Sequence, residues 1–153
     1  MNGSSKVIVI TGASSGFGEG AVKAFADKGY RVWGTLRDAQ GRNAAEKAAL
    51  EAYSSQVSVI DMDVTDDASV SAAFAHILAQ GPVDVLINNA GLMYFGIAEA
   101  FTIAQAKEQM ETNYYGAMRT MQAVLPAMRA AKSGLIINTS SVVGQISPPF
   151  LST

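Results

Sequence analysis

A strand-like run near the start of the chain leads directly into a turn that contains three glycines. Val7–Thr11 is entirely β-branched, and residues 11–18 follow the pattern T-G-x-x-x-G-x-G. A helical pattern begins within the turn. Gly12 lets the chain turn off the strand, and Gly16 and Gly18 keep side chains away from the N–H groups at a helix N-terminus, where the helix dipole contributes about half a positive charge. The pattern favours a diphosphate-binding turn, although glycines alone also fit a plain tight turn.

Strand-like and helix-like segments alternate along the rest of the chain. Continuous apolar runs are typical of strands buried on both faces of a parallel sheet, and periodic apolar positions between them indicate helices. The predicted strands are Val7–Thr11, Tyr30–Leu36, Gln56–Met62, Val83–Ile87 and Leu135–Thr139; the predicted helices are Ser15–Asp27, Asn43–Tyr53, one from Asp66 or Asp67 to Gly81-Pro82, and Ala104–Ala131, in which Pro126 is expected to end or kink a turn. This alternation predicts a doubly wound α/β fold, with helices on both faces of a parallel sheet and a ligand at the carboxyl ends of the strands.

The composition excludes several classes of protein. The 153 residues suffice for one domain, and the 49% of apolar residues supply a sizeable core. The net charge is −2 without any run of Lys or Arg, which argues against a nucleic-acid partner. There is no cysteine, and no motif indicates a metal site. No signal-peptide pattern or membrane-spanning apolar run is present, so we expect a cytoplasmic protein without membrane association.

Polar and glycine-containing motifs follow the later predicted strands. Asp63-Val64 follows the third strand, residues 88–91 (Asn-Asn-Ala-Gly) follow the fourth, and Ser140-Ser141 follows the fifth, while Asn113 lies in the long helix. Taken singly, each motif fits an ordinary strand end, turn or helix interruption. Because the carboxyl ends of parallel strands meet at one edge of a sheet, their joint order predicts a shared site.

Together with the glycine-rich turn, these motifs resemble the short-chain dehydrogenase/reductase family over almost the whole chain. The resemblance implies a Rossmann-type, three-layer αβα fold cut after strand five, so that residues 1–153 form a single NAD(P)-binding domain that is incomplete at its C-terminus. It also implies hydride transfer between NADP(H) and a small-molecule carbonyl or alcohol substrate, and a homo-oligomer at full length. The cofactor-binding residues that it implies are Gly12, Ser14, Gly16, Phe17, Gly18, Asp63, Val64, Asn89, Ala90 and Gly91.

The resemblance assigns a role to each of the later motifs. Asp63 and Val64 hold the adenine ring, with the carboxylate accepting from its exocyclic amine. Residues 89–91 border the adenine ribose and stabilise the sheet. Ser141 corresponds to the catalytic serine that polarises the substrate oxygen, and Asn113 to a helix asparagine whose backbone anchors a water of the proton relay.

The end of the second strand indicates which dinucleotide binds. NAD-preferring enzymes usually place an acid there for the ribose 2′-OH, but this position is Leu36, and Arg37 follows it. The planar guanidinium of Arg37 suits a 2′-phosphate, which favours NADP, with NAD as the alternative. Asp38 leaves two other arrangements open, since a shift of one residue would bring its carboxylate to the ribose, or it could pair with Arg37.

The family's general acid is a tyrosine in a Tyr-x-x-x-Lys motif after the serine, and no such motif follows Ser141 here. We therefore expect the chain as given to be inactive alone, and to be the N-terminal part of an enzyme whose sheet has an uncovered edge at strand five or its neighbour. The alternatives are a non-catalytic NADP(H)-binding module and a truncated pseudo-enzyme. Residues 93–95 (Met-Tyr-Phe) predict an apolar wall, which leaves the substrate open.

Overall fold

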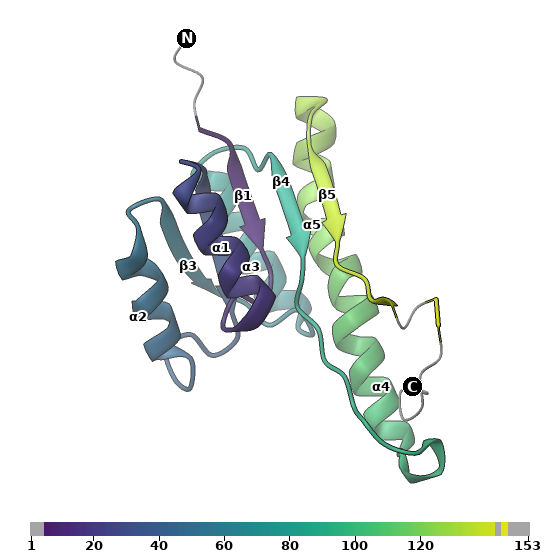
Figure 1. The fold of residues 1–153 in the computed structure, drawn as a ribbon. Helices are drawn as coiled ribbons and strands as arrows, with labels where there is room; N and C mark the ends of the chain where they lie inside the picture. The colour runs from purple at the N-terminus through teal and green to yellow at the C-terminus, as the bar shows by residue number, and fades with distance from the viewer. Residues whose placement is uncertain (1–4, 143–144, 147–153) are drawn as a thin grey trace.

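The computed structural model describes residues 5–142 and 145–146, which form a parallel sheet between two helical layers. Its strands pair in the order β3-β2-β1-β4-β5, and every pairing is parallel (Figure 1). The strands are β1 (Val7–Ile10), β2 (Arg31–Leu36), β3 (Val57–Asp61), β4 (Val85–Asn88) and β5 (Leu135–Asn138). The predicted doubly wound α/β fold is confirmed.

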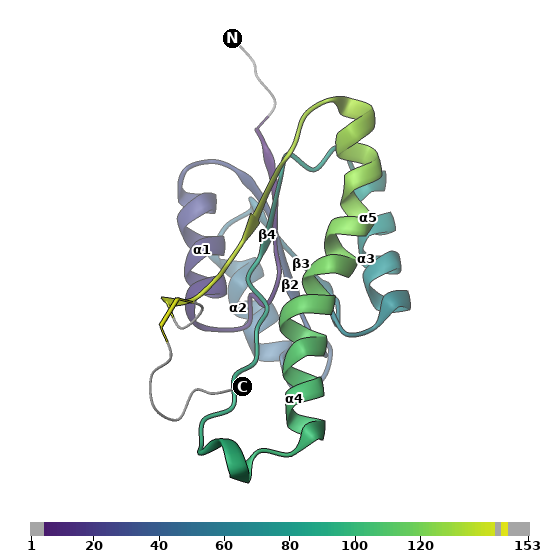
Figure 2. The same cartoon turned by 90° about the vertical axis from the view of Figure 1, so that its right-hand side faces the viewer.

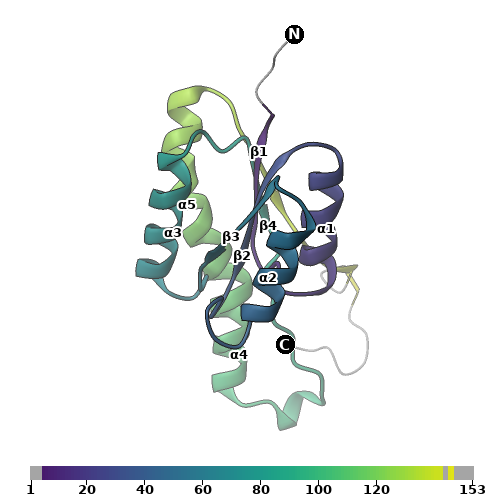
Figure 3. The same ribbon diagram turned by 90° about the vertical axis from the view of Figure 1, so that its left-hand side faces the viewer.

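The helices divide between the two faces of the sheet. Figures 2 and 3 show α1 (Gly16–Asp27) and α2 (Ala44–Tyr53) on one face, and α3 (Asp67–Ala79) and α5 (Gly116–Ala131) on the other. Two apolar cores result, and β1 contributes to both, since Val7 and Val9 face one core and Ile8 and Ile10 face the other. This alternation explains why β1 is a continuous apolar run.

The predicted helix Ala104–Ala131 follows one path but contains two kinds of turn. It consists of α4 (Ile103–Met110), a π-helical segment (Glu111–Tyr115) and α5. The short 3₁₀ turn Ala98–Ala100 precedes α4. The N-terminal end of α4 projects beyond the carboxyl ends of the strands (Figures 1 and 2). Helix α5 continues past Pro126, because the buried side chains Val124 and Met128 on either side of it hold the helix against the core.

Three hydrogen bonds join parts of the sheet and α5 that are far apart in the sequence. The backbone N–H of Val7 donates to the carboxylate of Asp84, 77 positions later, over 2.8 Å. Between the layers, the buried Thr120 hydroxyl donates to Asn88 Oδ1 over 2.6 Å, and Asn88 Nδ2 donates to Asn138 Oδ1 over 2.8 Å. A helix and two strands are thereby held in one register.

Strand β5 lies at the edge of the described sheet, where the side chains of Leu135 and Ile137 remain 53% and 41% exposed. The expected uncovered edge at strand five is therefore present in this part of the chain. None of the described helices is both long and apolar enough to cross a bilayer.

Candidate functional site

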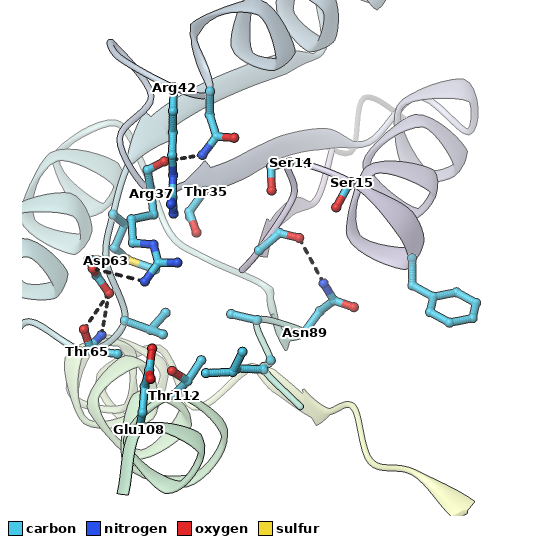
Figure 4. Close-up of a pocket in the computed structure, with 18 residues that line it drawn as sticks. Ser14, Ser15, Thr35, Arg37, Arg42, Asp63, Thr65, Asn89, Glu108 and Thr112 are labelled. Carbon is cyan, nitrogen blue, oxygen red and sulfur yellow. Dashed lines mark hydrogen bonds and ion pairs between the residues drawn. The ribbon is translucent and has the colours of Figure 1, made fainter. Parts of the chain in front are cut away.

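A pocket of about 380 Å³ opens at the carboxyl ends of the strands, where the loops after β1, β2, β3 and β4 meet the C-terminal end of α4 (Figure 4). This is the place at which a doubly wound sheet binds its ligand, because the order of the strands reverses on either side of β1. Polar groups from all four loops line the pocket, and apolar side chains contribute part of its wall.

The loop after β1 and the loop after β4 are held against each other by hydrogen bonds. The hydroxyl of Thr11 accepts from the N–H groups of Asn89 and Ala90, over 3.0 and 2.9 Å. In return, Asn89 Nδ2 donates to the carbonyls of Thr11 and Gly12. Gly12 has a φ of +67°, and a Cβ there would lie 2.7 Å from Ala90 Cα, so only glycine fits this contact.

The other two glycines of the turn have different reasons to be glycine. A Cβ on Gly18 would lie 2.2 Å from the carbonyl oxygen of Gly12, so this glycine allows α1 to pack against the turn rather than keeping a ligand's path clear. Gly16 has a φ of +59°, and a Cβ there would meet no atom within 4 Å. Open space beside Gly16 fits the expected approach of a diphosphate.

The N-terminus of α1 is available to an anion. Ser15, its N-cap residue, makes no hydrogen bond from its side chain to the helix, whereas Asp66 caps α3 through the N–H groups of Ala68 and Ser69. The first N–H groups of a helix need such acceptors, and a phosphate can supply them. Ser14, Ser15 and Phe17 line the pocket beside this end, and Phe17 is 89% exposed.

Asp63, which follows β3, is already oriented by its own loop. Its Oδ1 accepts from the N–H and the hydroxyl of Thr65, over 2.9 and 2.8 Å. Its Oδ2 lies 3.9 Å from Nη1 of Arg37, a long contact that leaves most of the guanidinium donors available. The carboxylate can therefore accept a further hydrogen bond inside the pocket, beside Val64.

The loop after β2 directs Arg37 and Asp38 to different surroundings. Leu36 is 1% exposed within the core, and Arg37 lines the pocket. Asp38 does not line it; its carboxylate accepts from the backbone N–H of Arg42 over 3.0 Å, within the turn. The nearest carboxylate partner of Arg37 is Asp63 rather than Asp38.

Asn113 and Ser141 lie outside this pocket. The side chain of Asn113 makes two hydrogen bonds to the backbone of Leu92, accepting from its N–H over 2.7 Å and donating to its carbonyl over 2.8 Å. Asn113 is in the centre of the π-helical segment, where the wider turn changes the register of the backbone hydrogen bonds; such segments are frequent at functional sites. Ser141 is exposed and follows β5, next to Ser140.

Comparison with known proteins agrees with this geometry. The family model of the short chain dehydrogenase matches residues 6–153, which is nearly the whole chain. The chain belongs to the short-chain dehydrogenase/reductase family. A short-chain dehydrogenase from Streptomyces avermitilis superposes with a TM-score of 0.88 at 38% identity, covering 99% of this chain and 55% of that one.

Two curated relatives of this short-chain dehydrogenase/reductase show the same partial coverage. Human retinol dehydrogenase 8 is 40% identical over 147 residues, which are 94% of this chain and 47% of the relative. The 3-ketodihydrosphingosine reductase of Bacteroides thetaiotaomicron is 39% identical over 146 residues, or 95% and 50%. The chain thus spans about half the length of the curated relatives it matches.

The structure brings together most of the residues that the sequence indicated for this short-chain dehydrogenase/reductase. All of the expected cofactor-binding residues except Gly16 and Gly18 line the pocket: Gly12, Ser14, Phe17, Arg37, Asp63, Val64, Asn89, Ala90 and Gly91. Sequence reasoning did not identify Ser15, Thr35, Arg42, Asn43, Met62, Thr65, Leu92, Glu108 and Thr112, which also line it. Thr35 lies next to the end of the predicted strand Tyr30–Leu36, so its position could have indicated that it lines the pocket. No feature of the sequence indicated that the side chain of Arg42 extends toward the pocket.

One further contact links the pocket to the loop that precedes α4. The Tyr94 hydroxyl donates to Glu108 Oε2 over 2.5 Å, and Gln109 Oε1 accepts from the N–H of Tyr94. The hydrogen bond to the Glu108 carboxylate raises the pKa of Tyr94 above its ordinary value. Within residues 5–142 and 145–146, no cluster of His, Asp or Glu has the arrangement of a metal site.

Proposed function

We propose that this chain is the nucleotide-binding part of an oxidoreductase that transfers a hydride between NADP(H) and a carbonyl or alcohol substrate. The choice of NADP rests on one observation: Arg37 lines the pocket, while Leu36, at the position where an acid would select NAD, is buried in the core. A guanidinium recognises a phosphate by paired hydrogen bonds, and Asp38, the acidic residue next to Arg37, does not line the pocket.

The residues of the pocket fit a dinucleotide along its length. We assign the diphosphate to the N-terminus of α1 and the glycine-rich turn, and the adenine ring to Asp63 and Val64. Residues 89–91 are assigned to the ribose beside the loop after β4. When bound, the cofactor supplies or accepts the hydride.

Two residues are assigned to the chemistry. Ser141 polarises the substrate oxygen through its hydroxyl, and Asn113 places a backbone group of the π-helical segment where a water of a proton relay can bind. The two hydrogen bonds from Asn113 to Leu92 support this assignment, because they hold the helix against the loop after β4. The activity itself belongs to the whole protein.

An apolar substrate fits the loop that precedes α4. Met93, Phe95 and Ile97 are 46%, 69% and 48% exposed, so three large apolar side chains of one loop are available to a ligand. The names of two relatives, a retinol dehydrogenase and a 3-ketodihydrosphingosine reductase, support the same class of substrate. We therefore propose an alcohol or ketone attached to an apolar chain or ring.

Cofactor preference tests the proposal most directly. Titration with NADP(H) and NAD(H) should show tighter binding of NADP(H), and Arg37→Asp should reverse that preference, because one charged phosphate contact is worth roughly 1.5–3 kcal/mol, or about one to two decades of affinity. Arg31→Asp is the matched control, since it makes the same change of charge at the opposite end of β2. Retained preference for NADP in Arg37→Asp would show that Arg37 is not the phosphate ligand.

Activity is tested separately, with the full-length enzyme and a panel of apolar ketones and aldehydes. NADPH oxidation that disappears in Ser141→Ala supports the assigned reaction. Tight NADP(H) binding without turnover on any carbonyl or alcohol would instead favour a non-catalytic binding module.

A further inference from the structure

The loop that follows β4 lies alongside α4, and side chains of the helical segment hold it there (Figures 1 and 2). Asn113 makes two hydrogen bonds to the backbone of Leu92. Two residues further along the loop, Gln109 Oε1 accepts from the backbone N–H of Tyr94 over 3.0 Å. The Tyr94 hydroxyl donates to Glu108 Oε2 over 2.5 Å. The loop is therefore fixed to the helix at two alternate residues.

The side chains of this loop alternate in their exposure. Leu92 and Tyr94, which the helix holds, are half-buried, whereas Met93, Phe95 and Ile97 are exposed. In an extended segment, successive side chains point to opposite sides. Contacts that hold Leu92 and Tyr94 against the helix therefore direct the neighbouring apolar side chains away from it.

Glu108 places the loop relative to the pocket. The side chain of Glu108 lines that pocket, as does Leu92, whereas Tyr94 does not. Figure 4 shows Glu108 close to Thr112, on the helix that closes one side of the pocket. The carboxylate that accepts from Tyr94 thus borders the space assigned to the nucleotide and contacts the loop assigned to the substrate.

We infer that Tyr94 is a positioning residue for the substrate, because its hydrogen bond to Glu108 holds the loop after β4 so that Met93 and Phe95 face an apolar chain or ring. The inference rests on the proposed oxidoreductase with an apolar substrate. It adds a polar residue that acts through its apolar neighbours. A mobile loop loses conformational freedom when a ligand binds, and that loss weakens binding. A loop that is already fixed avoids most of this loss.

The hydrogen bond between Tyr94 and Glu108 is not part of the framework that holds the sheet. The described residues of the two apolar cores include neither Tyr94 nor Glu108, and the bond between them is exposed to solvent. The backbone bond from Tyr94 to Gln109 does not involve the hydroxyl. Removal of the hydroxyl should therefore loosen the loop and leave the protein folded.

The test uses the full-length enzyme, saturated with NADPH, or with NADH if that binds more tightly, and the straight-chain ketones from 2-butanone to 2-octanone. An apolar wall raises kcat/KM as the ketone lengthens, by at most about fourfold for each methylene that it buries. Tyr94→Phe removes only the hydroxyl. It should lower kcat/KM about 3–10-fold for 2-octanone and less than about twofold for 2-butanone, through KM rather than kcat.

Two further variants test whether the hydroxyl acts through the apolar side chains. Phe95→Ala should weaken the same dependence on chain length, and the losses in Tyr94→Phe and Phe95→Ala should not add in the double variant, because both act on one contact. Tyr53→Phe is the matched control. Tyr53 also donates to a carboxylate, that of Asp27, but neither residue lines the pocket, so the ketone series should be unchanged.

The outcomes separate this inference from the proposed function. If the unmodified enzyme reduces none of the ketones, or reduces them without dependence on chain length, the proposed apolar substrate fails and the inference fails with it. If that dependence is present and Tyr94→Phe retains it in full, the inference fails alone. Calorimetric titration of Tyr94→Phe should give an unchanged affinity for the reduced cofactor. A weaker affinity, or an equal loss of kcat/KM for every ketone, would assign the hydrogen bond to the pocket itself and overturn the inference.

Discussion

The strands toward the two edges of the sheet differ in how much of their surface is buried. On one side, β2 lies between β1 and β3, and all of its residues except Arg31 are buried. On the other side, β5 pairs only with β4 in the described sheet, and none of its residues is buried. Strand β3 is also an edge strand, but its Val57 and Val59 are buried, so we call β1, β2 and β3 the closed half of the described sheet and β5 its open half.

The groups assigned to the two functions follow this division. The glycine-rich turn after β1, Arg37 and Asp63 come from the closed half, and hydrogen bonds within the chain fix their loops. Ser141 follows the open strand, and Asn113 holds the loop after β4 from an exposed position. The residues proposed for nucleotide binding therefore lie on a buried framework, whereas Ser141, proposed for the chemistry, follows an exposed edge strand of the described sheet.

The largest expected effect contrasts a core strand with the edge strand. Leu86 in β4 is 0% exposed, and Leu86→Ala should lower the free energy of unfolding by about 2–5 kcal/mol, because it removes buried methyl groups and leaves a cavity. Ile137→Ala in β5 should cost at most about 1 kcal/mol, since that side chain already contacts water. Chemical denaturation measures both, and equal losses would contradict the division into closed and open halves.

A second prediction separates ligand binding from folding within the turn. Gly16→Val should reduce dinucleotide affinity about 100-fold or more, because its side chain would occupy the space beside the α1 N-terminus. The positive φ of Gly16 adds a strain of roughly 1–2 kcal/mol, which leaves the protein folded. The readouts are calorimetric titration and thermal melting.

Two other glycines of α1 serve as controls for this prediction. Gly18→Ala should damage folding itself, since its Cβ meets the carbonyl of Gly12, and Gly20→Ala should be harmless, because its Cβ meets nothing within 4 Å. Micromolar dinucleotide binding by folded Gly16→Val would remove the phosphate assignment.

A third prediction concerns the hydrogen bonds that join α5, β4 and the open strand β5. Thr120→Val keeps the shape of the side chain but leaves Asn88 Oδ1 without its buried donor, so the free energy of unfolding should fall by about 1–3 kcal/mol. Thr120→Ser keeps the hydroxyl and should recover most of that loss. If Thr120→Val is as stable as the unmodified protein, the hydrogen bonds from α5 through Asn88 to Asn138 do not stabilise the packing of α5 and β5 against β4.

The smallest expected effect is on the pH dependence of stability in alkaline solution, and it involves two tyrosines, Tyr94 and Tyr53. Hydrogen bonds to carboxylates raise the pKa of Tyr94, through Glu108, and of Tyr53, through Asp27, above the ordinary value near 10. A raised pKa stabilises the folded state below pH 10, and this contribution is lost as the pH rises through the folded value. In an absorbance titration, each of the variants Tyr94→Phe and Tyr53→Phe should lack one phenol that ionises above the ordinary pH range of tyrosine. Loss of a phenol that titrates at the ordinary value would contradict the corresponding hydrogen bond.

Local pattern was enough to predict the architecture. The β-branched run Val7–Thr11 and the apolar run Leu135–Thr139 each end one residue earlier as strands in the structure. Strands buried on both faces need continuous apolar sequence, so composition over a few residues carries the signal. The glycine-rich turn after β1 was predictable for the same reason, because a turn with required glycines is encoded locally.

Other features depend on contacts far away in the chain. Helical periodicity does not distinguish an α-helical from a π-helical turn, and the segment Glu111–Tyr115 lies where Asn113 bonds to Leu92 and Gly116 packs against Val64. The inward direction of Arg42 depends on a turn that Asp61 holds from β3. Neither arrangement has a signal in the adjacent sequence.

The order of the strands has a consequence for how the protein is made. Strand β1 precedes the other described strands in the chain yet is central in the sheet, and its Val7 bonds to Asp84, 77 positions later. At a translation rate of roughly 5–20 residues per second, Val7 leaves the ribosome roughly 4–15 s before Asp84. During that interval β1 can pair with β2 but has an apolar, unpaired second edge. The speed at which β4 is delivered therefore sets how long the nascent chain is open to pairing with the wrong strand.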